Sequence, residues 1–192
     1  MVYQNMRKII CKYIKIVYQS ETLKNNNDNN YYSVDESLIN HYNGKQVWLI
    51  GICNNITKDF RIEASYKRDT EVLKEFINMY AEKNSFIITD VWPGYGFLDE
   101  QGSGYTRIKH IHGGGDFGFS HESTSHIEGI WSQIKSSIKE KYHLYPYQVF
   151  MQFVREIEFK IKIRSLSNED KIKKFFECYN LAESIEDICL KS

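Results

Sequence analysis

Three acidic residues that are far apart in the sequence, Asp35, Asp90 and Glu128, are of the type that binds divalent metal ions. Asp35 falls within the apolar stretch Tyr31–Ile39, Asp90 directly follows the apolar stretch Phe86–Thr89, and Glu128 stands near the start of a helical pattern. Carboxylate oxygens are the ligands that Mg²⁺ prefers. Two such ions about 3.5–4 Å apart hold the attacking and leaving oxygens of a phosphodiester. If the fold brings these acids together, the sequence predicts metal-assisted chemistry on a phosphodiester.

Each of the three acids also has an ordinary structural interpretation. Asp35 could be an exposed acid at a strand end. Asp90 precedes Val-Trp-Pro-Gly and could simply cap a turn. Ser125 and Glu128 have the spacing of a capping box, in which the glutamate satisfies a backbone N–H at the helix start. The residue types alone leave both interpretations open, so the elements that carry the acids have to decide.

Strands and helices succeed one another in an order that places the three acids on different elements. Alternating apolar residues and turn signals predict strands at Tyr31–Ile39, Val47–Cys53, Phe60–Tyr66, Phe86–Thr89 and Tyr105–His110. Helical spacing predicts helices over Glu71–Glu82, from about Ser125, from Pro146 to about Ile163 and over Asn168–Leu190, with a short helix at Trp92–Leu98. Three consecutive strands can pair as an antiparallel meander, whereas strands separated by helices need crossovers and are parallel. The predicted fold class is therefore α/β: an RNase H-like mixed five-stranded sheet flanked by helices, with additional C-terminal helices.

Composition limits the class of protein further. The 25 basic and 25 acidic side chains give a formal net charge of zero, so any DNA contact has to come from a local basic patch. The four cysteines form no C-x-x-C pair, which excludes a zinc ribbon and indicates reduced thiols. No apolar run approaches the ~20 residues of a membrane span, and no signal-peptide core is visible. We therefore expect a soluble intracellular protein without a membrane partner.

A cluster of histidines and glycines precedes Glu128. His110 and His112 alternate on one predicted strand, and with Asp116 or His121 they could bind zinc. Their spacing is unlike that of common structural zinc sites, so packing at the strand end is the favoured interpretation. The run Gly113–Gly115 is not followed by the Gly-Lys-Ser/Thr of a phosphate-binding P-loop, which leaves it as a turn.

A collinear series of short motifs runs through most of the chain. The motifs are SVDES (33–37), NGKQVWLIGI (43–52), YKRDTEVL (66–73), IITDVWPGY (87–95), GYTRIKHIH (104–112), STSHIEGIWSQIK (123–135) and FVREIEFK (153–160). Together they resemble the transposases of Merlin-type elements and their bacterial insertion-sequence relatives, and the most specific piece is Ile-Glu-x-x-Trp-Ser-x-x-Lys. Ile111, Ser123 and Lys160 depart from the usual Asn, His and Arg of that family, but the three acids are all in place.

The resemblance implies a DDE transposase, an enzyme that hydrolyses DNA phosphodiesters and then transfers a strand. Asp35, Asp90 and Glu128 would be its catalytic triad and would bind two Mg²⁺ ions, for which Mn²⁺ can substitute. His112 would lie near the active site, and Lys135 and Lys139 would contact DNA phosphates. Lys135 lies two helical turns beyond Glu128, although a solvated lysine on an amphipathic helix is an equally good interpretation. The expected partners are transposon ends and target DNA, with a homodimer as the expected assembly.

The resemblance also suggests a division of the chain. Residues 1–28 would be an N-terminal helix with an Asn-rich linker, a remnant of a DNA-binding region, because relatives carry a helix-turn-helix there. Residues 29–166 would form the catalytic domain and residues 167–192 an amphipathic helical extension. We therefore expect a truncated copy, acting in the nucleus of a eukaryotic host or otherwise in the cytoplasm or nucleoid. Two alternatives stay open: an RNase H-like nuclease without strand transfer, and a catalytically silent domesticated DNA-binding relic.

Overall fold

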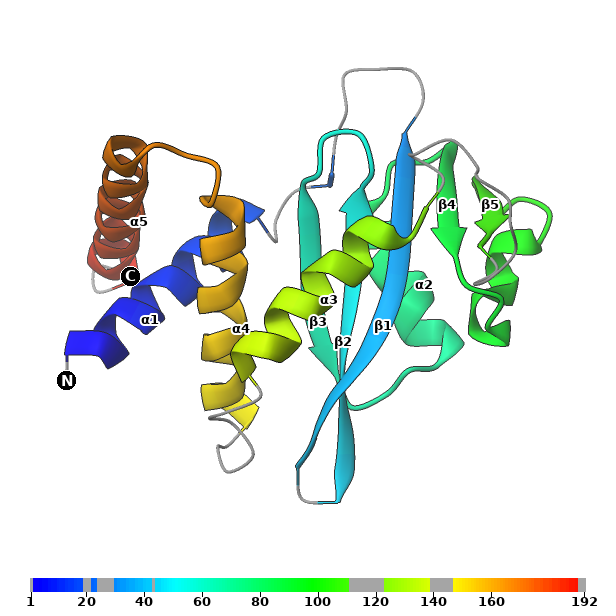
Figure 1. The fold of residues 1–192 in the computed structure, drawn as a ribbon, viewed down its shortest axis with the longest axis horizontal. Helices are drawn as coiled ribbons and strands as arrows, with labels where there is room; N and C mark the ends of the chain where they lie inside the picture. Colours follow the sequence, from blue (N-terminus) through cyan, green and yellow to red (C-terminus); the bar gives the residue numbers. More distant parts are fainter. Residues whose placement is uncertain are drawn as a thin grey trace. The chain divides into compact units, whose positions relative to one another are not determined.

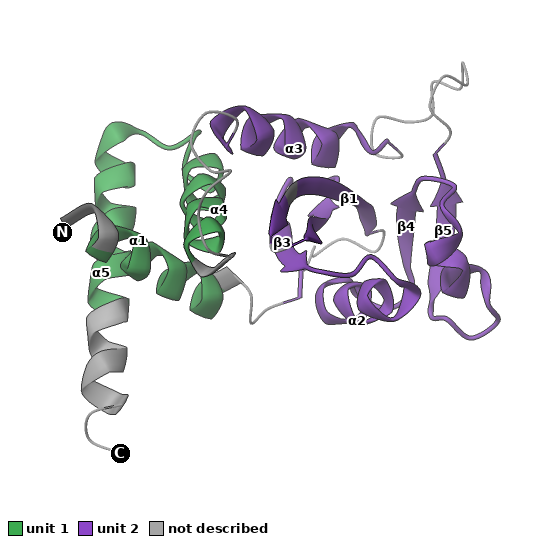
Figure 2. Cartoon of the chain, turned by 90° about the horizontal axis from the view of Figure 1, so that it is seen from below, with its two compact units in different colours: residues 1–21, 144–192 green, residues 22–143 purple. Residues whose placement is uncertain are grey.

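The structure is a computed structural model that describes residues 2–18, 22–23, 30–42, 44–110, 123–138 and 147–189. The chain divides into two compact units, residues 22–143 and residues 1–21 together with 144–192 (Figure 2). Among the described residues, no helix is long and apolar enough to cross a membrane. All three candidate acids lie in the unit of residues 22–143.

A mixed five-stranded sheet forms the centre of this unit (Figure 1). Its strands are β1 (Tyr31–Tyr42), β2 (Lys45–Asn54), β3 (Phe60–Ser65), β4 (Ser85–Thr89) and β5 (Tyr105–Lys109). The spatial order is β3-β2-β1-β4-β5, with antiparallel pairing among β3, β2 and β1 and parallel pairing of β1 with β4 and β4 with β5. The predicted RNase H-like arrangement is confirmed, because the meander and the two crossover strands occupy the expected places.

Two helices cover opposite faces of the sheet (Figure 2). Helix α2 (Thr70–Tyr80) begins where the Asp69 side chain accepts a hydrogen bond from the Val72 backbone N–H. Helix α3 (Ser125–Ile138) presents an apolar stripe to the other face: Ile127, Ile130, Trp131, Ile134 and Ile138 are its buried residues. The 3₁₀ helix η2 (Pro93–Asp99) starts at a proline, as the sequence predicted.

Side chains of β1 alternate between these two faces. Tyr32 and Val34 are fully buried in the same core cluster as Leu73 and Ile77 of α2. Because successive side chains on a strand point to opposite faces, Asp35 points to the face that α3 covers, and Glu36 points to the α2 face. The strand period therefore places two neighbouring acids of the sequence on opposite sides of the sheet.

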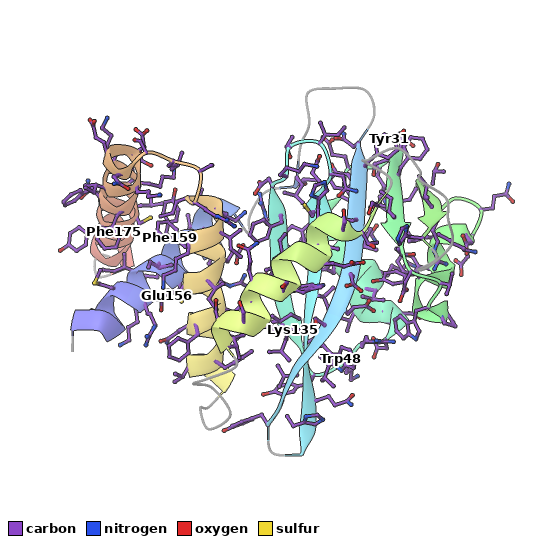
Figure 3. All side chains as sticks on the ribbon, in the orientation of Figure 1. Tyr31, Trp48, Lys135, Glu156, Phe159 and Phe175 are labelled. Carbon is purple, nitrogen blue, oxygen red and sulfur yellow. The ribbon has the colours of Figure 1, made fainter. Side chains whose placement is uncertain are left out.

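The second unit is helical. It contains α1 (Val2–Tyr13), the π-helical turn η1 (Ile14–Tyr18), α4 (Tyr147–Lys162) and α5 (Asn168–Cys189). Ile10, Tyr13, Ile14, Phe159 and Cys178 form a buried hydrophobic cluster in it, and Arg7 pairs with Glu156 at 2.7 Å. Figure 3 labels Phe159 and Glu156 on α4. Helix α4 thus clusters with the terminal helices, whereas the expected sequence boundaries placed it with the sheet. The reason is that its apolar face packs against α1, where the rings of Phe159 and Tyr13 lie 6.1 Å apart, and α1 lies at the far end of the sequence from α4.

Candidate active site

Asp35 occupies the middle of β1, the central strand of the sheet. The indole Nε1–H of Trp131 donates a hydrogen bond to Asp35 Oδ2 at 3.0 Å. Burial raises the pKa of the Asp35 carboxyl above its usual value, and the negative charges of Asp90 and Glu128 raise it further.

Gly51 makes room for the contact between Trp131 and Asp35. It is the cross-strand neighbour of Asp35 on β2. A Cβ atom at Gly51 would lie 2.6 Å from Trp131 Cη2 and 2.7 Å from Ile127 Cδ1, closer than real Cβ contacts come. The missing side chain therefore lets the indole of Trp131 lie against β2, where its N–H can reach the strand-centre aspartate.

Asp90 directly follows the last residue of β4. The last described pair of the parallel β1–β4 ladder is Ser33 with Ile88, so a continued register would place Asp90 opposite Asp35. Adjacent strands lie about 4.7–4.9 Å apart, and this spacing would bring the two aspartates close together at the end of β4. The backbone N–H of Trp92 donates to Asp90 Oδ1 at 2.9 Å, which is the turn-capping bond considered from the sequence.

Glu128 lies in the first turn of α3 and is exposed. The hydroxyl of Thr124 donates to Glu128 Oε1 at 2.6 Å. The local bond at the start of the helix is therefore made with Thr124, whereas the sequence pattern suggested Ser125. A reason is that α3 begins at Ser125, which leaves Thr124 as the residue just outside the helix.

A pocket of about 740 Å³ lies between β1 and α3. Asp35, Glu128, Trp131 and Lys135 are among the residues that line it, and Asp90 is not. Lys135 is exposed and lies on α3 two turns beyond Glu128 (Figure 3). A cationic side chain in the same pocket as two acids can offer a contact to a DNA phosphate. Two other predicted DNA contacts, His112 and Lys139, lie outside the described residues.

The donor chemistry of the three acids fits a hard divalent cation, because all three provide carboxylate oxygens. Within the ranges that the structure describes, however, no group of three His, Cys, Asp or Glu side chains lies closely enough to hold a metal ion. The chain's own donors, the Trp131 indole and the Thr124 hydroxyl, bind Asp35 and Glu128. Like charges also repel in the absence of a cation, which opposes their close approach. Convergence of the three carboxylates on metal ions stays a prediction.

Glu36 is a feature of this region that the sequence did not single out. Its side chain is only 2% exposed, Tyr95 donates a hydrogen bond to its Oε2 at 2.7 Å, and Arg68 Nε lies 3.9 Å from its Oε1. Burial raises the pKa of Glu36 to about 7. The Arg68 guanidinium in turn stacks on Trp48 and Trp92, at 4.6 and 4.1 Å from the ring centroids. An acid at an inward-facing strand position was the only sequence signal for this cluster.

Trp131 is buried, with only 4% of its surface exposed. Its hydrogen bond to Asp35 was not foreseen, because the bond joins residues 96 positions apart in the chain. The sequence signal was the spacing of three between Glu128 and Trp131, which puts both on neighbouring parts of one helix face.

Comparison with known proteins finds similar solved structures, whereas no curated protein matches the chain. Among solved structures, a chain of a simian T-cell lymphotropic virus intasome in complex with the PP2A regulatory subunit B56 gamma is 12% identical, with a TM-score of 0.49 over 78% of this chain and 53% of that one. The HTLV-2 integrase catalytic core domain in complex with magnesium, in its trimeric form, is 11% identical, with a TM-score of 0.45 over 79% of this chain and 95% of that one. The catalytic core domain of BIV integrase is 10% identical, with a TM-score of 0.43 over 77% and 97%.

A comparison with protein families gives the assignment. The model of the ISXO2-like transposase domain matches residues 15–162, a stretch that includes β1 to β5, α2, α3 and α4. All three candidate acids lie inside the matched region. The chain belongs to the family of ISXO2-like transposase domains.

Proposed function

We propose that this protein is a transposase catalytic domain that hydrolyses DNA phosphodiesters and transfers DNA strands with the help of divalent metal ions. The observation that supports the proposal is the placement of the three acids: Asp90 directly follows β4, in register with Asp35 on the neighbouring strand β1, and Glu128 of α3 lines the same pocket as Asp35. Membership of a transposase family supports the same chemistry. The substrates would be transposon ends and target DNA.

Asp35 and Asp90 would hold Mg²⁺ between them, and Glu128 would complete the coordination. Bound there, the ions would activate water and neutralise the charge that develops on the phosphodiester. The chain's own residues act around this centre: the Trp131 N–H orients Asp35, and the exposed Lys135 offers a positive charge to a phosphate in the same pocket. Mn²⁺ would replace Mg²⁺, because both prefer oxygen ligands.

The finer assignment follows the motifs of residues 33–164, which resemble Merlin-type transposases and their bacterial relatives. In this proposal residues 29–166 are the catalytic domain, residues 1–28 are an N-terminal helix with an Asn-rich linker, and residues 167–192 are a helical extension. His112 and Lys139 would join Lys135 in contacting DNA, and the active assembly would be a homodimer. Such a protein acts wherever the host keeps its DNA, in the nucleus or in the nucleoid.

Asp90→Asn tests the catalytic assignment. The amide keeps the shape of the side chain and its bond to the Trp92 N–H, but it removes the charge that would hold the cation. We expect the variant to lose at least about 10²-fold of Mg²⁺-dependent nicking of a labelled duplex, in line with losing a main electrostatic contribution. Glu75→Gln, which removes an exposed acid of α2 on the other face of the sheet, is the matched control and should stay active. Full activity of a folded Asp90→Asn protein would rule Asp90 out as a metal ligand.

The products of the same assay separate the alternatives. A duplex with a free 3′-hydroxyl end, mixed with a supercoiled plasmid, should yield joined products if the domain transfers strands. Nicks without joined products would identify a nuclease. Binding of DNA without either product, in Mg²⁺ and in Mn²⁺, would identify a catalytically silent DNA-binding domain.

A further inference from the structure

We infer that Arg107, on β5, is a positioning residue for Asp90: its guanidinium fixes the stretch of backbone from which the Asp90 carboxylate projects. The inference rests on the proposed role of Asp90 as a metal ligand. It concerns a residue on a different strand from any of the three acids.

Asp90 needs such support because it lies just beyond the ladder between β4 and β5. The last pair of that ladder is Thr89 with Lys109, followed only by the bond from the His110 N–H to the Thr89 carbonyl. Beyond this point, no strand ladder determines the direction of the backbone. The position of the Asp90 carboxylate then depends on the bond from the Trp92 N–H to its Oδ1 and on the side-chain bonds that hold the backbone of residues 90 and 92.

The Arg107 side chain makes three bonds to this stretch. Its Nε–H donates to Thr89 Oγ1 at 2.9 Å. Its Nη2 donates to the carbonyl oxygens of Asp90 and Trp92, at 2.9 and 3.3 Å. Thr89 Oγ1–H donates to the same Asp90 carbonyl at 2.8 Å. The backbone on both sides of the Asp90 side chain is therefore held by one guanidinium and one hydroxyl.

The remaining contacts hold the guanidinium itself. Nη1 of Arg107 donates to Asp99 Oδ2 at 3.0 Å, and the guanidinium lies 5.6 Å from the Tyr95 ring centroid. The Arg107 side chain is 3% exposed, so solvent competes little for its bonds. A planar guanidinium with five N–H donors in a fixed fork can serve a hydroxyl, two carbonyls and a carboxylate at once. A lysine ammonium at the same place keeps the charge but cannot reach all four.

The test is the affinity for Mn²⁺ of Arg107→Lys, measured by titrating free Mn²⁺ with electron paramagnetic resonance. Loss of a residue that orients a metal ligand typically weakens metal binding about 10–100-fold, so we expect a weakening of about 10-fold in this variant. Lys109→Gln is the matched control, because Lys109 lies on β5 like Arg107 and its ammonium pairs with the same Asp99 at 2.9 Å, whereas among the described residues its side chain makes no bond to Asp90. The control should bind Mn²⁺ like the original chain, even if its melting temperature falls.

A second variant keeps the inference testable if Arg107→Lys does not fold. Thr89→Val has nearly the same shape but removes the hydroxyl that links Arg107 Nε to the Asp90 carbonyl, and it should weaken Mn²⁺ binding by several-fold. Unchanged Mn²⁺ affinity in folded Arg107→Lys or, where that protein does not fold, in Thr89→Val would overturn the inference. Asp90→Asn distinguishes failure of the proposed function from failure of the positioning role. If Asp90→Asn also leaves Mn²⁺ binding unchanged, the proposed function fails. If it abolishes Mn²⁺ binding while the Arg107 and Thr89 variants bind normally, only the positioning role of Arg107 fails.

Discussion

Gly51→Ala should damage the candidate site although Gly51 carries no functional group. The added Cβ would lie 2.6 Å from two carbon atoms of the Trp131 ring and 2.7 Å from Ile127 Cδ1, whereas ordinary contacts begin at about 3.4 Å. Trp131 and Ile127 are both buried on α3, so neither can swing into solvent. The indole therefore has to move away from β2, or α3 has to lift from the sheet.

The expected cost has two parts. Overpacking a core by one methyl group costs about 1–3 kcal/mol of stability. A shift of the indole that restores an ordinary contact would also stretch the 3.0 Å bond between Trp131 Nε1 and Asp35, and a hydrogen bond to a charged group contributes roughly 1.5–3 kcal/mol. Because relaxation of the helix recovers part of both, we expect Gly51→Ala to lower the free energy of unfolding by about 2–4 kcal/mol.

Urea unfolding followed by tryptophan fluorescence measures this loss. Gly129→Ala is the matched control, because Gly129 is an exposed residue within α3 and a Cβ there meets nothing within 4 Å. Alanine replaces glycine in a helix interior with a gain of roughly 0.5–1 kcal/mol, so the two substitutions should have opposite signs. If Gly51→Ala were as stable as the original chain, the proposed role of Gly51 in seating the indole would be wrong.

Two further predictions concern charged side chains on the two faces of the sheet. In metal-free buffer with EDTA, Glu36→Gln should flatten the dependence of stability on pH. Burial raises the pKa of Glu36 from the ordinary 4.5 to about 7, so the neutral side chain stabilises the fold fully below pH 4.5. This contribution, at most about 3 kcal/mol, is lost as the pH rises through 7. Urea unfolding between pH 5 and 8 measures the difference, and parallel curves for both proteins would contradict the prediction. Lys135→Gln should weaken binding to a random duplex and reduce the slope of log affinity against log salt by about 0.9, the effect of one lost phosphate contact. Lys74→Gln, on the exposed side of α2, is its control, and equal slopes for the two variants in a salt titration would remove Lys135 from the DNA contacts.

Local patterns were sufficient to predict the elements of the sheet unit. The strand that carries Asp35 and the buried strand before Asp90 were recognisable from apolar residues, and the isoleucine stripe of α3 from its helical spacing. Both signals depend only on the geometry of a few consecutive residues, namely a period of two in strands and of 3.6 in helices. The order of these elements then restricted the sheet to a meander with two crossover strands, because parallel neighbours need a connecting helix.

The assignment of the three acids relied on sequence motifs and on the folded structure together. The motifs around Asp35, Asp90 and Glu128 are far apart in the sequence, and their resemblance to transposases singled them out. The matched family region contains all three acids. The influence of Asp90 and Glu128 on the pKa of Asp35, which they raise, is a property of the folded chain, because it depends on the distance between charges. The surroundings of each acid, namely the Trp131 indole, the Trp92 backbone and the Thr124 hydroxyl, could not be read from composition or spacing.

By itself the sequence determined which segments are strands and helices, which face of each is apolar, and which three acids are candidates for metal-dependent chemistry. Only the tertiary structure decided that Trp131 binds Asp35, that Gly51 makes room for it, and that Arg107 of β5 holds the backbone at Asp90. The physical reason is the separation of the partners along the chain. Periodicity arises from interactions between near neighbours in the sequence, whereas these contacts join distant residues that strand pairing and helix packing bring together. A glycine that is needed for a close approach and an arginine that binds two carbonyls have no local signature, because their partners lie on other elements.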